Sequence, residues 1–277
     1  MKQLIVIFLI VFIIGITKMK LSFKIVNALF TNIYYLYIST GKFAHNRLLL
    51  DYAYQSSSKK VLNHFNISPI IYGKFIDKPK LIVCNHHTWL DGGLIKYAYP
   101  HFLTIAKHDS SKEFFLSGIV TEFLKRWGSI LYKRGNKNSG SIVRKLIKYH
   151  ITYKKKSILV FPEGKTYPDG PPQNFFPGSL IVAYESNIPV QPAVIKYSQD
   201  IAWTNIGNNV QSYNDNIYKN MDRLLRSKTT ALVEILKPIY PKDFSNKEDF
   251  IKYIRLRMLK SWFLLYYKIK KVKMLKY

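Results

Sequence analysis

From about Lys59 onwards, short apolar runs alternate with longer stretches in which apolar residues recur every three to four positions. The short runs, rich in β-branched and aromatic residues, predict strands, and the amphipathic stretches predict helices. This alternation favours an α/β layer fold with a mostly parallel central sheet flanked by helices. The predicted strands are Ile70–Tyr72, Leu81–Cys84, Ser129–Tyr132, Ser157–Phe161, Val190–Lys196 and Ala231–Leu236; the predicted helices are Thr88–Ala98, Ser111–Arg126, Ser139–Tyr153, Gly178–Glu185 and Asp215–Arg226.

Two apolar segments, Leu4–Ile16 and Leu21–Ile38, precede this pattern. The first is shorter than the ~20 residues of a membrane-spanning helix, and no small-residue cleavage site of a signal peptide follows it. We therefore expect residues 1–40 to form membrane-anchoring helices, which span the membrane or lie in its interface. A signal peptide and a buried core helix are the alternatives. The lysines after the first segment favour a cytosolic location for the rest of the chain.

The remaining chain divides into an α/β domain, residues 59–245, and a C-terminal basic, aromatic helix, residues 246–277. Aromatic residues and lysines lie side by side in this last segment. Such a helix fits a membrane interface. It fits equally well a solvated basic face whose aromatic stripe packs on the core.

Composition narrows the class of protein. A hydrophobic content of 48% over 277 residues suffices for a sizeable core. The net charge of +27, from 43 Lys and Arg against 16 Asp and Glu, attracts the chain to anionic lipid, phosphorylated substrates or nucleic acid. Cys84 is the single cysteine, which excludes an intramolecular disulfide and a multi-cysteine zinc site, and its apolar neighbours predict a small core residue.

The segment after Leu81–Cys84 carries the main candidate chemistry. His86 can accept a proton, and Asp91 can orient its ring, which together make a general base. Thr88 and Asp91 also fit the capping box that opens a helix, and a single histidine at a strand end is commonly structural. The other strand ends must therefore decide between these interpretations.

Three groups of polar residues directly follow predicted strands: His86, Arg134 and the pair Glu163-Gly164. In α/β sheets, ligands bind at the carboxyl ends of strands, where neighbouring loops converge. We therefore expect these residues to share one cleft, with Lys165 as a further cation. Cations beside a candidate base predict an anionic substrate such as a phosphate ester.

Other motif-based functions are excluded. Gly164-Lys165-Thr166 ends like a phosphate-binding loop, but Leu159 stands where that loop requires a glycine. The sequence contains no Gly-x-Ser-x-Gly elbow and no His-Glu-x-x-His zinc motif.

Four motifs together resemble the glycerolipid acyltransferases of the lysophosphatidate (1-acylglycerol-3-phosphate) acyltransferase type. They have the order and spacing of that family and cover approximately residues 65–200. The motifs are Asn85-His86-x4-Asp91, Ser129–Arg134, Phe161–Thr166 and Ile188–Val194.

This resemblance implies a glycerol-3-phosphate acyltransferase-like fold and a membrane-bound enzyme. It would move a fatty acyl group from acyl-CoA or acyl carrier protein to a lysophospholipid hydroxyl, above all that of 1-acylglycerol 3-phosphate, in phospholipid synthesis or remodelling. His86 would be the base and Asp91 its orienting partner, brought together by a local chain reversal. No metal or redox cofactor is implied, and the partners are membrane lipids rather than nucleic acid. The substrate-binding residues implied by the resemblance are Arg134, Glu163, Gly164, Lys165, Thr166 and Pro192.

Some of these residues have further interpretations. Glu163 would orient Arg134 or a glycerol hydroxyl, and Pro192 would shape the floor of the cleft, end a strand or turn a loop. Lys165-Thr166 replaces the family's commoner Thr-Arg, and Pro177 stands where a lysine is common. These departures leave the head group open. The alternatives are a phospholipid–lysophospholipid transacylase and a glycerol-3-phosphate acyltransferase, with a basic nucleic-acid-binding or scaffold protein more distant.

Overall fold

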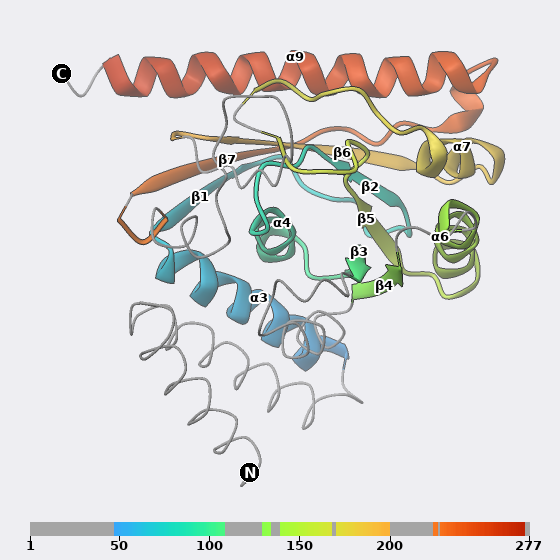
Figure 1. The fold of residues 1–277 in the computed structure, drawn as a ribbon, viewed down its shortest axis with the longest axis horizontal. Coiled ribbons are helices and arrows are strands. Elements are labelled where there is room, and N and C mark those ends of the chain that lie inside the picture. Colours follow the sequence, from blue (N-terminus) through green and yellow to red (C-terminus); the bar gives the residue numbers. More distant parts are fainter. Residues whose placement is uncertain are drawn as a thin grey trace, which may run out of the picture.

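The structure is a computed structural model that describes residues 47–108, 129–133, 139–167, 170–199, 224–226 and 228–274 (Figure 1). Within these residues, one sheet has the strand order β1-β7-β6-β2-β5-β3-β4. The strands are β1 (Ile67–Tyr72), β2 (Leu81–Cys84), β3 (Phe102–His108), β4 (Ser129–Lys133), β5 (Ser157–Val160), β6 (Val190–Tyr197) and β7 (Thr229–Ile235). The helices are α3 (Arg47–His64), α4 (Asp91–Ala98), α6 (Ser139–Lys148) with its π-helical continuation η1 (Tyr149–Tyr153), α7 (Gly178–Glu185), the 3₁₀ turn η2 (Pro241–Asp243) and α9 (Lys247–Met274).

The sheet is mostly parallel, which confirms the prediction. Strands β6, β2, β5, β3 and β4 run in one direction, and β7 pairs antiparallel with β6. Strand β1 then pairs parallel with β7. Every residue of β2 and β5 is buried, as expected for central strands that are covered on both faces.

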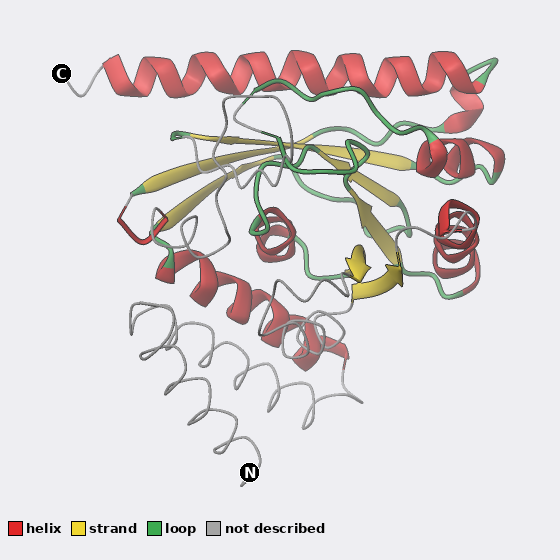
Figure 2. Cartoon of the chain, viewed as in Figure 1, coloured by secondary structure: helices red, strands yellow, loops and turns green. Residues whose placement is uncertain are grey.

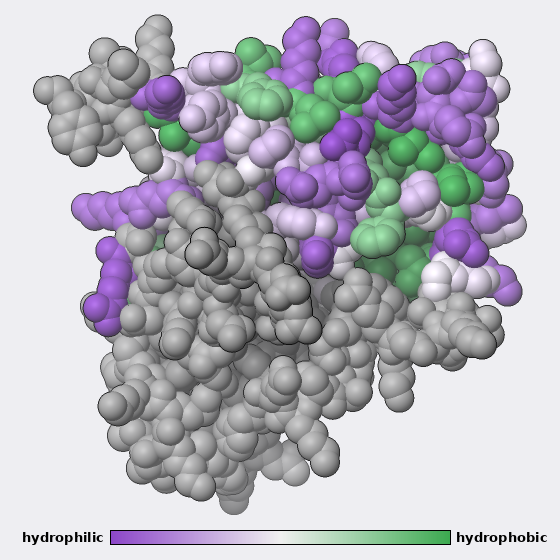
Figure 3. All heavy atoms as spheres, turned by 45° about the horizontal axis from the view of Figure 1, so that its top comes forward, coloured by the Kyte–Doolittle hydropathy of each residue, from purple (hydrophilic) through white to green (hydrophobic). Residues whose placement is uncertain are grey.

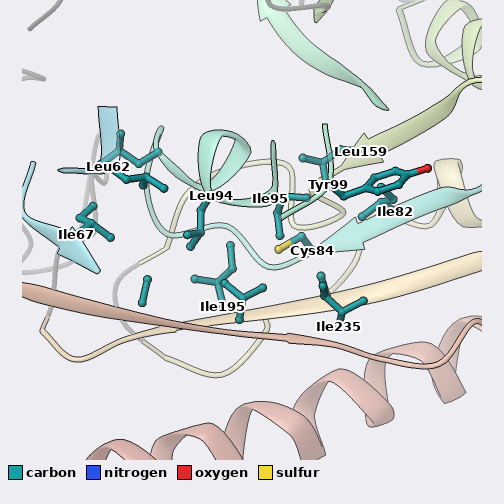
Figure 4. Packing of buried hydrophobic residues seen from close by; sticks show 14 of the residues in the cluster. Leu62, Ile67, Ile82, Cys84, Leu94, Ile95, Tyr99, Leu159, Ile195 and Ile235 are labelled. Carbon is teal, nitrogen blue, oxygen red and sulfur yellow. The ribbon is translucent and has the colours of Figure 1, made fainter. Parts of the chain in front are cut away.

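Helices cover both faces of the sheet (Figure 2): α3 and α4 lie on one side, and α9 lies along the other. Alternate residues of β2 point to opposite faces, so Ile82 and Cys84 join the core on the α3 and α4 side. Leu81 and Val83 join the second core, which contains residues of α6, α7 and α9. Figure 4 shows Cys84 among the buried aliphatic side chains of the first core, where the sequence placed it.

Several elements match the sequence predictions closely. The bounds of β2 and α7 are those predicted, and the other predicted strands differ by a few residues at their ends. The predicted helix Thr88–Ala98 begins later, at Asp91, and the end of Ser139–Tyr153 is π-helical. The prediction Ser111–Arg126 lies outside the described residues, as does most of Asp215–Arg226.

Two elements were not predicted. Strand β3 has only partly buried residues at its centre, and its place depends on non-local pairing with β5 and β4. Helix α3 buries serines as well as apolar residues, so its apolar stripe is weak in the sequence: Ser57 and Ser58 are fully buried. It begins before the domain boundary expected at residue 59 and packs against α4 and β1.

Helix α9 packs along the sheet through one stripe of side chains. Its buried residues are spaced by three or four positions, which places them on one helical face: Phe250, Ile254, Met258, Trp262, Leu265 and Ile269. For this face, the core-packing interpretation of the C-terminal helix is correct. Phe263 and Tyr267 are exposed on the remaining surface.

The predicted anchoring helices, within residues 1–40, lie outside the described part of the chain. Among the helices that the structure describes, none is both long enough and apolar enough to cross a membrane.

The packing of α9 predicts unequal effects of two neighbouring truncations. Met258 is fully buried, whereas Leu256 is 52% exposed. Met258→Ala should lower the free energy of unfolding by about 2–5 kcal/mol, because it removes buried methylenes and leaves a cavity. Leu256→Ala, the control, should change it by less than about 0.5 kcal/mol. Urea unfolding of both variants in the same buffer measures the difference, and equal losses would contradict the assigned faces.

Candidate active site

The loop after β2 begins with Asn85, whose side-chain amide makes hydrogen bonds to the backbone of β6. Asn85 Nδ2 donates to the carbonyl of Ile195 at 2.8 Å, and its Oδ1 accepts from the Ile195 N–H at 2.8 Å. Asn85 thus bonds to β6 as a strand residue would. It is fully buried, so it fixes where the loop with His86 leaves the sheet.

His86 and Asp91 form the hydrogen-bonded pair that the sequence predicted. His86 Nδ1 lies 2.8 Å from Asp91 Oδ2. A carboxylate accepts, so Nδ1 carries the hydrogen and Nε2 is left with a lone pair. The His86 side chain is 21% exposed, and its ring stacks on Phe161 with centroids 4.0 Å apart. Nε2 is therefore the atom of this pair that can take a proton from a ligand.

Asp91 also organises the backbone around it. Its Oδ2 accepts from the N–H groups of His87 at 2.6 Å and Thr88 at 2.9 Å. The bond from Thr88 is one half of the predicted capping box. The other half is absent: the Thr88 hydroxyl is buried and has no hydrogen-bond partner among the described residues. The cap prediction is thus correct for Asp91 and wrong for the Thr88 side chain.

The charge of Asp91 is stabilised by its neighbours. Burial alone would raise the pKa of Asp91, but the hydrogen bond from His86, the nearby ring of His87 and the hydrogen bond from the Tyr197 hydroxyl lower it below its ordinary value. Asp91 is fully buried. The carboxylate is therefore ionised at neutral pH and available to hold the ring of His86.

His87 has a structural environment, unlike His86. Its Nε2 lies 2.8 Å from Asn85 Nδ2, and its Nδ1 lies 3.2 Å from the carbonyl of Tyr167. Because the amide of Asn85 donates, Nε2 accepts and Nδ1 donates to the carbonyl. His87 is 3% exposed. It joins the loop after β2 to the loop after β5 and has no ring nitrogen left for a ligand.

Tyr197, at the end of β6, is a site residue that the sequence analysis missed. Its hydroxyl donates to Asp91 Oδ1 at 2.7 Å, and the ring is 1% exposed. Burial and the adjacent negative charge of Asp91 raise the pKa of Tyr197 well above its ordinary value, so it remains a donor. A buried tyrosine needs a hydrogen-bond partner, but the sequence separation from Asp91 concealed which one.

Glu163 lies in the loop after β5 and is 2% exposed. Burial, assisted by the charge of Asp91, raises its pKa to about 8, although the backbone N–H groups of His86 and Gln173 and the charge of Arg255 act in the opposite direction. Glu163 is therefore mainly a neutral carboxylic acid at pH 7. Its Oε1 is buried without a hydrogen-bond partner among the described residues.

The other predicted site residues have different positions. Gly164 is exposed and has φ of +70°, a conformation that favours glycine, directly after Glu163. Lys165 is exposed, with Nζ 4.9 Å from the centroid of the Tyr167 ring, and Thr166 is half-buried. Arg134 lies outside the described residues.

Pro192 is buried inside β6, where it pairs in register with Val83. It neither ends a strand nor turns a loop, so those two interpretations are wrong. Its position on the strand, before Ile195 and Tyr197, places it deeper in the sheet than the His86 loop.

A pocket of about 300 Å³ lies beside Phe161, the ring on which His86 stacks. Its walls are largely apolar, with one cationic side chain, Arg144 of α6. His86 is not among the residues that line this pocket, and Phe161 is the residue that the pocket and the His86 stack share. Within the described residues, no three His, Cys, Asp or Glu side chains gather as metal ligands.

Comparisons with known proteins show which sequences and which fold this chain resembles. A sequence model of the family described as Acyltransferase matches residues 59–196. A curated lyso-ornithine lipid O-acyltransferase from Pseudomonas aeruginosa is 28% identical over 175 residues, which cover 61% of this chain and 62% of that protein. The match thus spans less than two thirds of that relative.

The fold is similar to that of a solved structure, the 1-acyl-sn-glycerophosphate (LPA) acyltransferase PlsC from Thermotoga maritima. The TM-score is 0.50 at 18% sequence identity, and the likeness covers 85% of this chain and 95% of that one.

The raised pKa of Glu163 predicts a pH-dependent stability. Its folded pKa is about 8, against an ordinary 4.5, so between these values the folded state binds more protons. The free energy of unfolding should then fall as pH rises through this range, by up to about 1.4 kcal/mol per pH unit from this group. Glu163→Gln, which stays neutral, should lack that component.

Urea unfolding across the pH range tests this prediction. Glu185→Gln, at an exposed position at the end of α7, is the control and should keep the wild-type slope. An unchanged slope in Glu163→Gln would show that Glu163 is ionised in the folded protein.

Proposed function

We propose that this chain, which belongs to the acyltransferase family by the match of the family model to residues 59–196, transfers a fatty acyl group from a thioester to the hydroxyl of a lysolipid. The observation that carries this proposal is the His86–Asp91 pair. It leaves Nε2 of a partly exposed histidine free to accept a proton at the carboxyl end of β2. A hydroxyl needs such a base, because its own pKa is too high for attack at neutral pH.

In the proposed reaction, Nε2 of His86 removes the proton of the acceptor hydroxyl as its oxygen bonds to the thioester carbonyl carbon. The tetrahedral adduct then collapses, the C–S bond breaks, and the departing thiolate takes the proton from the imidazolium. The products are an ester and a free thiol. Asp91 holds Nδ1–H throughout and stabilises the positive charge that forms on the ring.

Glu163 supports this step in two ways. Its carboxyl interacts with the backbone N–H of His86, which holds the base at the cleft. As a neutral acid it can also donate a hydrogen bond to an acceptor oxygen, which an ionised carboxylate cannot. Lys165 comes shortly after β5, and Arg134 comes directly after β4 in the sequence. Both would supply cations for an anionic head group.

The acceptor that we favour is 1-acylglycerol 3-phosphate, because the cations of the motif loops match a phosphate ester. The name of the Pseudomonas aeruginosa relative points instead to a lyso-ornithine lipid. Both are lysolipids with a free hydroxyl. The donor that we favour is acyl-CoA or acyl carrier protein, with a phospholipid donor as the transacylase alternative.

An acyl-transfer assay tests this proposal. Purified full-length protein in detergent micelles is incubated with labelled acyl-CoA, acyl carrier protein or phospholipid donor and a panel of acceptors: 1-acylglycerol 3-phosphate, other lysophospholipids, lyso-ornithine lipid and glycerol 3-phosphate. We expect acyl transfer to a lysolipid, and a loss of about 10²- to 10⁴-fold in His86→Ala.

His101→Ala is a matched control. His101 also pairs with an aspartate, since its Nδ1 lies 2.6 Å from Asp51 Oδ2. It precedes β3 and so lies at the opposite, amino end of that strand. This variant should keep its activity. Failure of every donor and acceptor with folded wild-type protein would refute the proposed function.

Removal of the Tyr197 hydroxyl should weaken catalysis without weakening binding. Tyr197→Phe removes the 2.7 Å hydrogen bond to Asp91, so the pKa of Asp91 should rise and the acidic limb of the kcat/KM profile should move to higher pH. We expect kcat to fall by about 10-fold, with KM little changed. Tyr153→Phe, at a 71% exposed position, is the control. A change in KM alone would contradict a positioning role.

A further inference from the structure

The outward face of α9 is unusually apolar for an exposed helix. Leu256, Phe263 and Tyr267 are spaced by seven and four positions, which aligns them on one side of the helix. They are 52%, 47% and 65% exposed, and no described element covers them. Leu264 and Tyr253 flank this row and are also exposed. We call Leu256, Phe263 and Tyr267 the outer row.

Positive charge surrounds the outer row. Between Phe250 and the end of α9 the sequence contains no Asp or Glu, and its cations are Lys252, Arg255, Arg257, Lys260, Lys268, Lys270, Lys271 and Lys273. Lys252, Lys260 and Lys270 are exposed near the row. Figure 3, with the top of the molecule turned forward, shows hydrophobic and hydrophilic side chains side by side in its upper part.

We propose that this face of α9 docks on an anionic lipid bilayer. Exposed aromatic and aliphatic side chains can insert at the level of the head groups, where aromatic rings are favoured. Lysines beside them can extend their charge towards anionic lipid while their methylene stems remain on the apolar surface. The face therefore offers both parts of an interfacial helix, and its opposite stripe fixes it to the sheet.

Two other occupants fit these observations less well. A second copy of the chain would bring two acid-free basic faces together, which like-charge repulsion opposes. Single-stranded nucleic acid could stack on Phe263 and Tyr267, but Leu256 and Leu264 would offer its bases no aromatic face.

The same helix contacts the loop that follows Glu163. Arg255 Nε donates to the carbonyl of Gln173 at 3.2 Å, and its charge acts on Glu163. A bilayer bound to the outer row would thus be separated from the loop that follows Glu163 by α9. The docking proposal itself does not depend on the acyl-transfer reaction.

A local fluorescent label tests contact at this face in the full-length protein. Cys84 is the single cysteine and is fully buried, so Tyr267→Cys can be labelled selectively with an environment-sensitive dye such as nitrobenzoxadiazole. With vesicles of phosphatidylglycerol and phosphatidylcholine in equal parts, we expect a blue shift and an increase in emission of about twofold or more. The change should weaken in pure phosphatidylcholine vesicles and in about 1 M salt.

Tyr153→Cys provides the matched control, because Tyr153 is 71% exposed and belongs to η1 rather than to α9. It should show no such change. Leu256→Cys is a second reporter on the outer row, should Tyr267→Cys fold poorly.

Three outcomes would overturn the proposal. The first is an unchanged emission at both outer-row positions while vesicles sediment with the protein. The second is a change that grows with protein concentration in the absence of lipid, which would assign the face to a second copy. The third is a response to single-stranded RNA and none to vesicles. Because the label reads local contact, these outcomes are independent of catalytic activity.

Discussion

The carboxylate of Asp91 is the group on which the local structure of the site depends. It accepts hydrogen bonds from the His86 ring, from two backbone N–H groups and from Tyr197. One buried anion, at the first residue of α4, thus holds the backbone of the loop after β2 and connects the loop and the helix to β6. A buried charge is costly unless it is fully paired, so these partners and the ionised state of Asp91 require one another. The hydrogen bonds that hold the loop are therefore also the ones that keep Asp91 ionised and orient His86.

Two carboxyl groups near His86 have opposite electrostatic environments. Asp91 has hydrogen-bond donors at both oxygens and a lowered pKa. Glu163 is buried with fewer compensating interactions, and its pKa rises to about 8. Separate pKa values of this kind allow one anion and one neutral acid to coexist beside one histidine at pH 7. The charge of Asp91 is itself one reason why Glu163 stays protonated.

The central part of the fold was predictable because its signals are local. The continuous apolar run of β2 and the short apolar segment of α7 lie within the segments themselves, and His86 and Asp91 are five positions apart. Non-local features were not predictable. Strand β3 is defined by its pairing with β4 and β5. The buried face of α3 includes polar residues such as Ser57, so the sequence shows no clear apolar stripe there. The hydrogen bond from Tyr197 to Asp91 joins residues that are far apart in the sequence. The capping-box pattern predicted hydrogen bonds from both side chains, whereas only the Asp91 carboxylate bonds to the backbone of this turn.

The stacking of His86 on Phe161 has a consequence for the timing of catalysis. With centroids 4.0 Å apart and planes inclined by 13°, the ring is held flat while Asp91 fixes its edge. The imidazole has therefore lost most of its rotational freedom before any substrate arrives. Binding then does not have to order the base, and that entropy is not subtracted from the affinity or from the rate. A smaller side chain at position 161 would restore this rotational freedom. Substrate binding would then have to order the imidazole of His86 before it could accept a proton.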